Sequence, residues 1–133
     1  MYLIFGGINL KIACGTDIIE IKRVKNAVNE IGEKFLHKIF SDEEINYCEA
    51  HGDNKYEHYA ARFAVKEATF KAINKIKKEE ILEWKKFFVK NLDGGKPLIL
   101  IEDEELKKKI VDIDVSISHC KDYAMATTVI IYE

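Results

Sequence analysis

The centre of the chain reads Arg62-Phe63-Ala64-Val65-Lys66-Glu67-Ala68-Thr69-Phe70-Lys71-Ala72, which places apolar residues on two faces at helical spacing. One broad face joins Ala60, Phe63, Ala64, Glu67, Phe70 and Lys71, and the opposite face joins Ala61, Val65, Ala68, Ala72 and Ile76. A helix that is apolar on both sides is typical of a protein core. The pattern therefore predicts one long and largely buried helix over residues 56–75.

Two carboxylates stand among aliphatic residues. Glu67 lies in the middle of the first helix face, and Asp17 lies in Gly15-Thr16-Asp17-Ile18-Ile19-Glu20-Ile21, a run typical of a buried strand end. A carboxylate that loses its water needs a cation or several hydrogen-bond donors. If the fold brings both together, they suit Mg²⁺, which accepts few protein ligands and completes its shell with water and substrate phosphates.

Lys71 lies one helical turn beyond Glu67. On an exposed helix this spacing gives an ordinary ion pair, which stabilises a helix by only a few tenths of a kcal/mol. Inside a buried helix the lost hydration of both charges is harder to offset, which favours a functional ligand or ion. The spacing alone is compatible with both interpretations.

His119 ends a predicted strand and follows Ser116-Ile117-Ser118. Such a histidine either bonds to the adjacent turn or, beside two hydroxyl groups, holds a phosphate by charge-assisted hydrogen bonds. Asp93-Gly94-Gly95-Lys96-Pro97 is most simply a hairpin turn, and it lacks P-loop spacing. The sequence also lacks the GxSxG motif of a serine hydrolase and the paired histidine and cysteine spacing of a zinc site.

Length and composition set broad limits. The 133 residues fit one compact domain over 1–133, with residues 1–9 as a possible N-terminal extension. The 21 basic and 23 acidic side chains give a net charge of -2, so no global field favours nucleic acid or an anionic membrane. Three separated cysteines form no disulfide framework, which favours a reducing cytoplasm. The apolar opening is too short to span a membrane and lacks the basic start of a signal peptide.

The order of predicted elements gives the fold class. We expect a strand over 8–14, a helix over 19–31, a helix opened by the capping box Ser41-Asp42-Glu43-Glu44, and then the long helix. A hairpin follows over 84–92 and 96–101, then a short helix over 102–110 and strands over 112–119 and 123–132. This order predicts an α+β fold in which an antiparallel sheet packs against the long central helix.

Three segments together resemble the small bacterial 4'-phosphopantetheinyl transferases. They are Gly15-Thr16-Asp17-Ile18 with Arg23, the central stretch from Arg62 to Ala72, and Ser116-Ile117-Ser118-His119 followed by Tyr123-Ala124. The match spans most of the chain in the family's order. The resemblance implies transfer of phosphopantetheine from coenzyme A to a serine of apo-acyl-carrier protein, with release of adenosine 3',5'-bisphosphate, in support of fatty acid biosynthesis.

The resemblance also implies roles for single residues. Asp17 and Glu67 match magnesium ligands, and Lys66, Glu67 and Lys71 match catalytic positions, with Lys71 near the coenzyme A diphosphate. The set expected to bind coenzyme A is Arg62, Lys66, Lys71, Gly95, Lys96, Pro97, Ser118 and His119, with His119 near its 3'-phosphate. Arg23 and Phe63 match positions that meet the acidic carrier protein, although the following helix has only a modest positive face.

The small members of the family are similar in forming homotrimers with active sites between subunits. Larger members carry a third acidic ligand two residues after the first, where this chain has Ile19. Three other functions remain open from the residues: a non-catalytic module that binds coenzyme A or an adenine nucleotide, a two-carboxylate phosphohydrolase that uses water, and a structural adaptor. Only the transferase accounts for all three motifs together.

Overall fold

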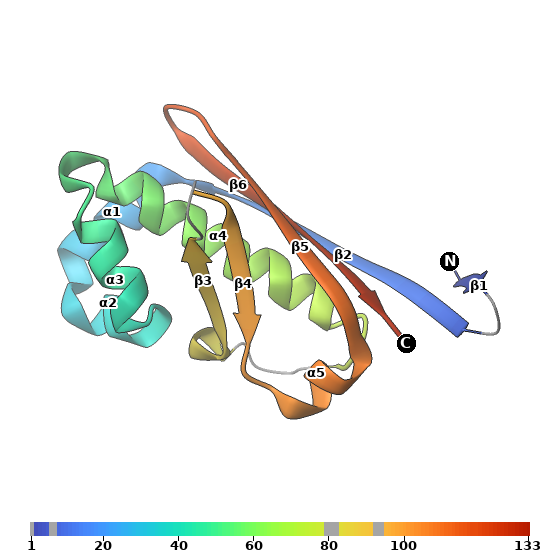
Figure 1. The fold of residues 1–133 in the computed structure, drawn as a ribbon. Helices are drawn as coiled ribbons and strands as arrows, with labels where there is room; N and C mark the ends of the chain where they lie inside the picture. Colours follow the sequence, from blue (N-terminus) through green and yellow to red (C-terminus); the bar gives the residue numbers. More distant parts are fainter. Residues whose placement is uncertain (1, 6–7, 79–82, 92–94) are drawn as a thin grey trace.

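The computed structural model describes residues 2–5, 8–78, 83–91 and 95–133 (Figure 1). The strands are β1 (Tyr2–Phe5), β2 (Ile8–Glu20), β3 (Phe87–Asn91), β4 (Pro97–Ile101), β5 (Ile110–His119) and β6 (Tyr123–Tyr132). The α-helices are α1 (Ile21–Ile31), α2 (Glu33–Ile39), α3 (Asp42–Glu49), α4 (Lys55–Ile73) and α5 (Glu104–Lys109), with short 3-10 helices η1 (Gly52–Asn54) and η2 (Trp84–Lys86).

Two antiparallel sheets enclose the long helix α4. The larger sheet has the strand order β1-β2-β6-β5, and the smaller one is the β3-β4 hairpin. In Figure 1, α4 runs between the long strands and the hairpin, while α1, α2 and α3 gather around its first turns. The predicted α+β fold with a central helix is confirmed.

The N-terminal strand is longer than the sequence predicts. Strand β2 pairs with β6 residue by residue from Lys11↔Tyr132 to Glu20↔Tyr123, and α1 starts only at Ile21. Asp17 therefore lies within the strand opposite Ala126, and its prediction as a strand-end residue is wrong. Pairing with a distant strand extends β2, and no local pattern in the sequence encodes that partner.

Helix α2 is missing from the sequence prediction. Gly32 does end α1, as expected, with a backbone φ of 72° that suits glycine. The chain then resumes a helix at once, because Leu36 and Ile39 turn inward and become buried. Seven residues are too few for periodicity to reveal a helix.

Other predictions agree with the structure. Ser41 Oγ accepts from the Glu44 backbone N–H at 3.2 Å, and Glu44 Oε1 accepts from the Ser41 N–H at 3.0 Å, which completes the predicted capping box. The predicted hairpin strands pair from Phe87↔Ile101 to Asn91↔Pro97, whereas residues 92–94 of its turn lie outside the described residues. None of the described helices has the length and apolar character needed to cross a bilayer.

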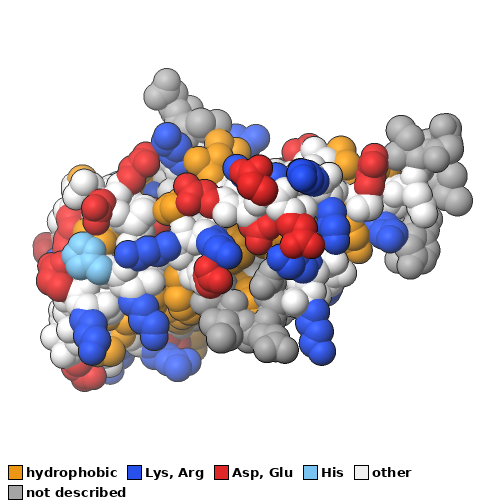
Figure 2. Space-filling model, turned by 90° about the horizontal axis from the view of Figure 1, so that it is seen from below, with side chains coloured by type: hydrophobic (Ala, Val, Ile, Leu, Met, Phe, Trp, Pro, Cys, Tyr) orange, Lys and Arg blue, Asp and Glu red, His pale blue; other side chains and the backbone are white. Residues whose placement is uncertain are grey.

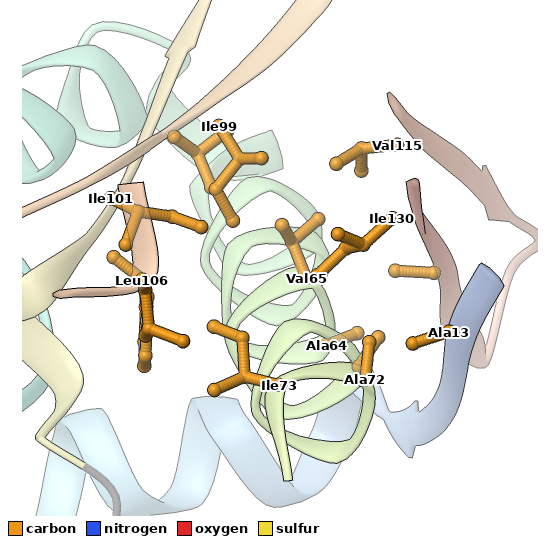
Figure 3. Packing of buried hydrophobic residues seen from close by; sticks show 14 residues of the cluster. Ala13, Ala64, Val65, Ala72, Ile73, Ile99, Ile101, Leu106, Val115 and Ile130 are labelled. Atoms are coloured by element: carbon orange, nitrogen blue, oxygen red, sulfur yellow. The ribbon is translucent and has the colours of Figure 1, made fainter. Parts of the chain in front are cut away.

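The core is built around α4 (Figure 3). Val65 and Ile73 of α4 meet side chains from β2, β4, β5, β6 and α5, and all of these side chains are buried. One polar contact crosses this core, because the hydroxyl oxygens of Thr69 and Thr128 lie 2.9 Å apart and both residues are fully buried. That bond fixes α4 on the sheet between the positions of Glu67 and Lys71.

The outer surface carries mixed charge. On the face shown in Figure 2, basic and acidic side chains alternate with small apolar areas between them. On this face neither sign of charge predominates, as the net charge of -2 leads one to expect.

Candidate functional site

The two carboxylates singled out by the sequence converge. Lys71, one helical turn after Glu67, donates from Nζ to Asp17 Oδ1 at 3.1 Å and to the Thr16 carbonyl at 2.9 Å. Burial raises the pKa of Glu67 above its ordinary value, the charge of Asp17 raises that pKa further, and Lys71 opposes both effects. Because Lys71 contacts Asp17 of β2 and lies one helical turn after Glu67 on α4, both carboxylates lie beside the same ammonium between β2 and α4.

Gly15 allows this convergence. A Cβ atom at Gly15 would lie 2.0 Å from the Ala68 carbonyl oxygen and 2.8 Å from the Ala72 nitrogen, both in the backbone of α4. No larger residue permits β2 to cross α4 this closely. Asp17 follows two residues later, on the same face of the strand, and therefore points at the same side of α4.

The donor set fits a hard divalent cation. Within residues 2–5, 8–78, 83–91 and 95–133, no group of three or more His, Cys, Asp or Glu side chains gathers. Asp17 and Glu67 offer two carboxylates beside the ammonium of Lys71, and burial, followed by the charge of Asp17, raises the pKa of Glu67. Mg²⁺ matches a site of this kind because it tolerates few protein ligands and retains water or phosphate oxygens.

A separate pocket collects several of the residues expected to bind coenzyme A. Its volume is about 370 Å³, and its lining includes Arg62, Gly95, Pro97 and His119. These residues come from α4, from the start of β4 and the chain just before it, and from the end of β5. The structure thus brings together predicted coenzyme A residues that lie up to 57 positions apart in the sequence, as Arg62 and His119 do.

Arg62 gives this pocket, named the anion pocket below, a buried positive charge. Its side chain is only 3% exposed, its guanidinium stacks 3.9 Å from the centre of the Tyr47 ring, and one terminal nitrogen donates to Asn91 Oδ1. Its Nε has no hydrogen-bond partner, and no carboxylate among the described residues forms an ion pair with it. A buried guanidinium without a counter-ion favours the binding of an anion.

The sheet register places the pocket beside the carboxylate pair. Asp17 of β2 pairs with Ala126 of β6, which in turn pairs with Ile117 of β5, and Ile117 lines the pocket. Residues directly opposite in neighbouring strands point to the same face of the sheet. Two strand spacings of about 4.8 Å separate Asp17 and Ile117 by about 10 Å. One extended ligand can therefore reach both places.

Lys66 lies away from this site. Its ammonium contacts Glu44 Oε1 at 2.8 Å and the carbonyl oxygens of Ile39, Trp84 and Phe87 at 3.0, 3.0 and 2.7 Å. The side chain is fully buried, and an ammonium has only three protons to donate. In this structure Lys66 has no donor left for a diphosphate, in contrast to the role that the sequence resemblance implied.

The remaining predicted residues lie outside the pocket. Lys96 and Ser118 are exposed and do not line it. Arg23 is exposed on α1, and Phe63 is partly buried against Trp84, with ring centres 4.9 Å apart.

The sequence analysis missed several residues of the pocket lining, among them Tyr47, His58 and Asn91. For His58 a signal existed, because it precedes Arg62 by four residues and so lies on the same helix face. Tyr47 and Asn91 come from other elements, and nothing local links them to Arg62.

Comparison with known proteins identifies the family. Residues 13–128 match the sequence profile of the 4'-phosphopantetheinyl transferase superfamily. The chain belongs to this superfamily. A superfamily member from Thermodesulfovibrio yellowstonii, named holo-[acyl-carrier-protein] synthase, is 44% identical over 116 residues, which cover 87% of this chain and 95% of the relative. A protein of the same name from Ruminiclostridium cellulolyticum is 40% identical over 128 residues, covering 91% and 92%.

Solved transferase structures share the fold. The Helicobacter pylori holo-[acyl-carrier-protein] synthase in complex with coenzyme A superimposes with a TM-score of 0.76 at 29% identity, covering 88% of this chain and 98% of that one. The Bacillus anthracis holo-(acyl-carrier-protein) synthase in complex with CoA (3',5'-ADP) gives a TM-score of 0.72 at 31% identity, covering 91% and 96%. The resemblance read from three motifs is thereby confirmed.

Proposed function

We propose that this chain is a holo-[acyl-carrier-protein] synthase, which transfers 4'-phosphopantetheine from coenzyme A to a serine of apo-acyl-carrier protein. The observation that carries the proposal is the placement of a carboxylate pair about 10 Å from a pocket with an unpaired buried arginine, on one row of the sheet. Coenzyme A carries a diphosphate and a separate 3'-phosphate, so its 3'-phosphate suits the cationic pocket at Arg62 and its diphosphate suits a cation held by the carboxylate pair. The names of the relatives support the same activity.

In this proposal the pocket binds the nucleotide end of coenzyme A. Arg62 and His119 contact the 3'-phosphate, and Gly95 and Pro97 form the wall beside the nucleotide. Among the residues expected to bind coenzyme A, Lys96 and Ser118 then act only from the rim, because both are exposed outside the pocket.

Asp17 and Glu67 would hold Mg²⁺. When bound there, the ion supplies positive charge to the diphosphate and so favours departure of the nucleotide phosphate. Burial and then the charge of Asp17 raise the pKa of Glu67, and a bound cation would oppose both effects. Half of the Lys71 side chain is exposed, so its ammonium can exchange Asp17 for a phosphate oxygen.

The nucleophile belongs to the acceptor protein. The serine hydroxyl passes its proton to the surrounding water, and its oxygen forms a bond to the phosphorus of the pantetheine arm. The bond from that phosphorus to the bridging oxygen breaks, and adenosine 3',5'-bisphosphate leaves with that oxygen. This chain contributes position and charge rather than a covalent intermediate. Arg23 on α1 and Phe63 on α4 are proposed to meet the acidic carrier.

The larger sheet offers a surface for self-association. Ile12 and Ile18 of β2 are 49% and 62% exposed, and Met125 and Val129 of β6 are 42% and 39% exposed. Alternate residues of a strand share a face, and β2 and β6 are neighbours, so these side chains form one apolar strip. We propose that copies of this chain cover the strip in a homotrimer with active sites between subunits. We also propose that the chain acts in the cytoplasm, in fatty acid biosynthesis.

A mass assay tests the activity. The chain is incubated with coenzyme A, magnesium and apo-acyl-carrier protein, and the carrier is expected to gain the mass of one phosphopantetheine group. Asp17→Asn and Glu67→Gln should abolish this gain, and Lys71→Ala should lower turnover. Lys75→Ala is the matched control, because Lys75 lies four residues further along, just beyond α4, and its ammonium donates to the Cys14 carbonyl at 2.6 Å.

Two outcomes contradict the proposal. Full activity of Asp17→Asn or Glu67→Gln in magnesium removes the metal assignment. Tight binding of coenzyme A without any gain in carrier mass, tested over fatty-acid, peptide and polyketide carriers, favours the non-catalytic binding module instead.

A further inference from the structure

Two histidines are stacked at the edge of the anion pocket. The rings of His51 and His58 lie 3.7 Å apart between their centres at an interplanar angle of 33°. His51 Nδ1 lies 2.8 Å from the Tyr47 carbonyl oxygen, so this nitrogen carries the proton and donates it. The bond fixes the ring of His51 against that of His58.

His58 lines the pocket one helical turn before Arg62. It also meets the Tyr47 ring edge-on, with ring centres 5.6 Å apart. Tyr47 thus contacts both His58 and Arg62, since the guanidinium stacks on its face. The three side chains form one packed unit, which holds His58 in place without the help of a ligand.

The charged groups around His58 explain its state in the free protein. Arg62 and Glu57 face it from α4, His51 from the segment before η1, and His119 from the end of β5. Burial lowers the pKa of His58 below its ordinary value, as do His51, Arg62 and His119, whereas Glu57 raises it. His58 is therefore neutral at pH 7 when the pocket holds no anion.

We propose that His58 is a recognition residue for a terminal phosphate, neutral in the free protein and protonated when a phosphate monoester binds beside Arg62 and His119. This inference rests on the proposed function, in which that monoester is the 3'-phosphate of coenzyme A. A dianionic phosphate supplies two negative charges to a site where burial and like charge had kept the imidazole neutral. The proton comes from the buffer, and the charged imidazole then forms a charge-assisted hydrogen bond to the phosphate.

Titration calorimetry tests the proposal. Adenosine 3',5'-bisphosphate is titrated into the full chain at pH 7 in two buffers that differ in ionisation enthalpy. The wild type should take up about 0.5 to 1 proton per ligand bound, because one imidazole changes state. Adenosine 5'-phosphate and inorganic phosphate distinguish the 3'-phosphate of a nucleotide from phosphate in general, and both should bind with smaller uptake.

Variants test whether His58 is the side chain that takes up the proton. His58→Gln should lose the uptake, and its dissociation constant at pH 6 should be about tenfold weaker than that of the wild type, with the difference closing by pH 8. His37→Gln is the matched control, since His37 is exposed on α2 and pairs with Glu33. It should behave as the wild type does.

A measurement on the unaltered chain covers the case in which His58→Gln fails to fold. The ring-proton NMR signal of His58 should titrate at higher pH with the bisphosphate bound than without it. Binding without proton uptake, equal uptake by folded His58→Gln, or an unmoved His58 titration would overturn the inference and leave the transferase proposal standing. Failure of the wild type to bind the bisphosphate at all would overturn both.

Discussion

Replacing Glu44 with Gln should leave the buried ammonium of Lys66 without its counter-ion. Lys66 and Glu44 are 0% and 1% exposed, and their charged atoms are 2.8 Å apart. The Ser41 and Val89 backbone N–H groups donate to different carboxylate oxygens, and the single oxygen of a Gln amide can still accept from Ser41 but not also from Val89. The substitution therefore removes the negative charge beside Lys66 together with one buried hydrogen bond.

The size of the effect follows from burial. Removing one partner of a buried ion pair costs about 3–5 kcal/mol, because the other charge stays desolvated. Three backbone carbonyls remain around the ammonium and reduce this cost, so we expect about 3 kcal/mol. Since domains of this kind have a total stability of about 5–15 kcal/mol, the loss is a large fraction of it.

Urea unfolding provides the assay. Glu44→Gln should lower the denaturation midpoint without changing the slope against urea. The double variant Glu44→Gln with Lys66→Met also removes the unpaired ammonium, and it should recover most of the lost free energy of unfolding. Glu83→Gln is the control, because its pair with Lys86 is largely exposed and should contribute less than about 1 kcal/mol.

Two results would refute this reasoning. A cost for Glu44→Gln no larger than that for Glu83→Gln would show that burial does not govern the Lys66 pair. Recovery of stability by the double variant without recovery of phosphopantetheine transfer would return Lys66 to the catalytic role that the sequence resemblance implied. We expect the double variant to keep its turnover, since Lys66 Nζ faces Glu44 and not the candidate site.

Three further predictions concern the site and the sheet. Gly15→Ala should lower stability by at least about 1–3 kcal/mol in urea unfolding, because its new methyl group meets the backbone of α4; an unchanged midpoint would contradict the close crossing. Glu67→Gln should raise the melting temperature at pH 7 without metal, since the pKa of Glu67 is raised in the folded state and stability is lost as pH rises through that value. Thermal scans at pH 4 and pH 8 should show this gain only at the higher pH, and an equal gain at both would argue against the carboxylate pair. Ile18→Asp should give monomers in sedimentation analysis, whereas the control Ile31→Asp, which alters an exposed residue of α1, should remain a trimer. If Ile18→Asp also forms trimers, the apolar strip of the sheet is not the interface.

Local sequence patterns were sufficient for much of the fold. Helical spacing predicted α4 and both of its apolar faces, the capping box predicted the start of α3, and the strand predicted over 112–119 corresponds to β5. Each of these features depends on residues within a few positions of one another. The candidate carboxylate pair also came from such patterns, because a charge in an apolar run stands out without knowledge of its neighbours.

Long-range features required the tertiary structure. The length of β2 depends on β6, more than a hundred residues away, and the anion pocket depends on segments from α3, α4, β4 and β5. The unpaired state of Arg62 and the stack of His58 on His51 can be recognised only once those segments meet.

The contrast between what the sequence and the tertiary structure determine is clearest at Lys66, Glu67 and Lys71. The sequence determined that all three charges lie on one buried helix, and the motif suggested a shared site for them. Each residue turns a helix by 100°, so Lys66 is directed at Glu44 inside the protein while Glu67 and Lys71 lie beside Asp17. The periodicity of the sequence sets which residues face inward, but the partner that neutralises each buried charge is set only by the packing of distant segments around the helix.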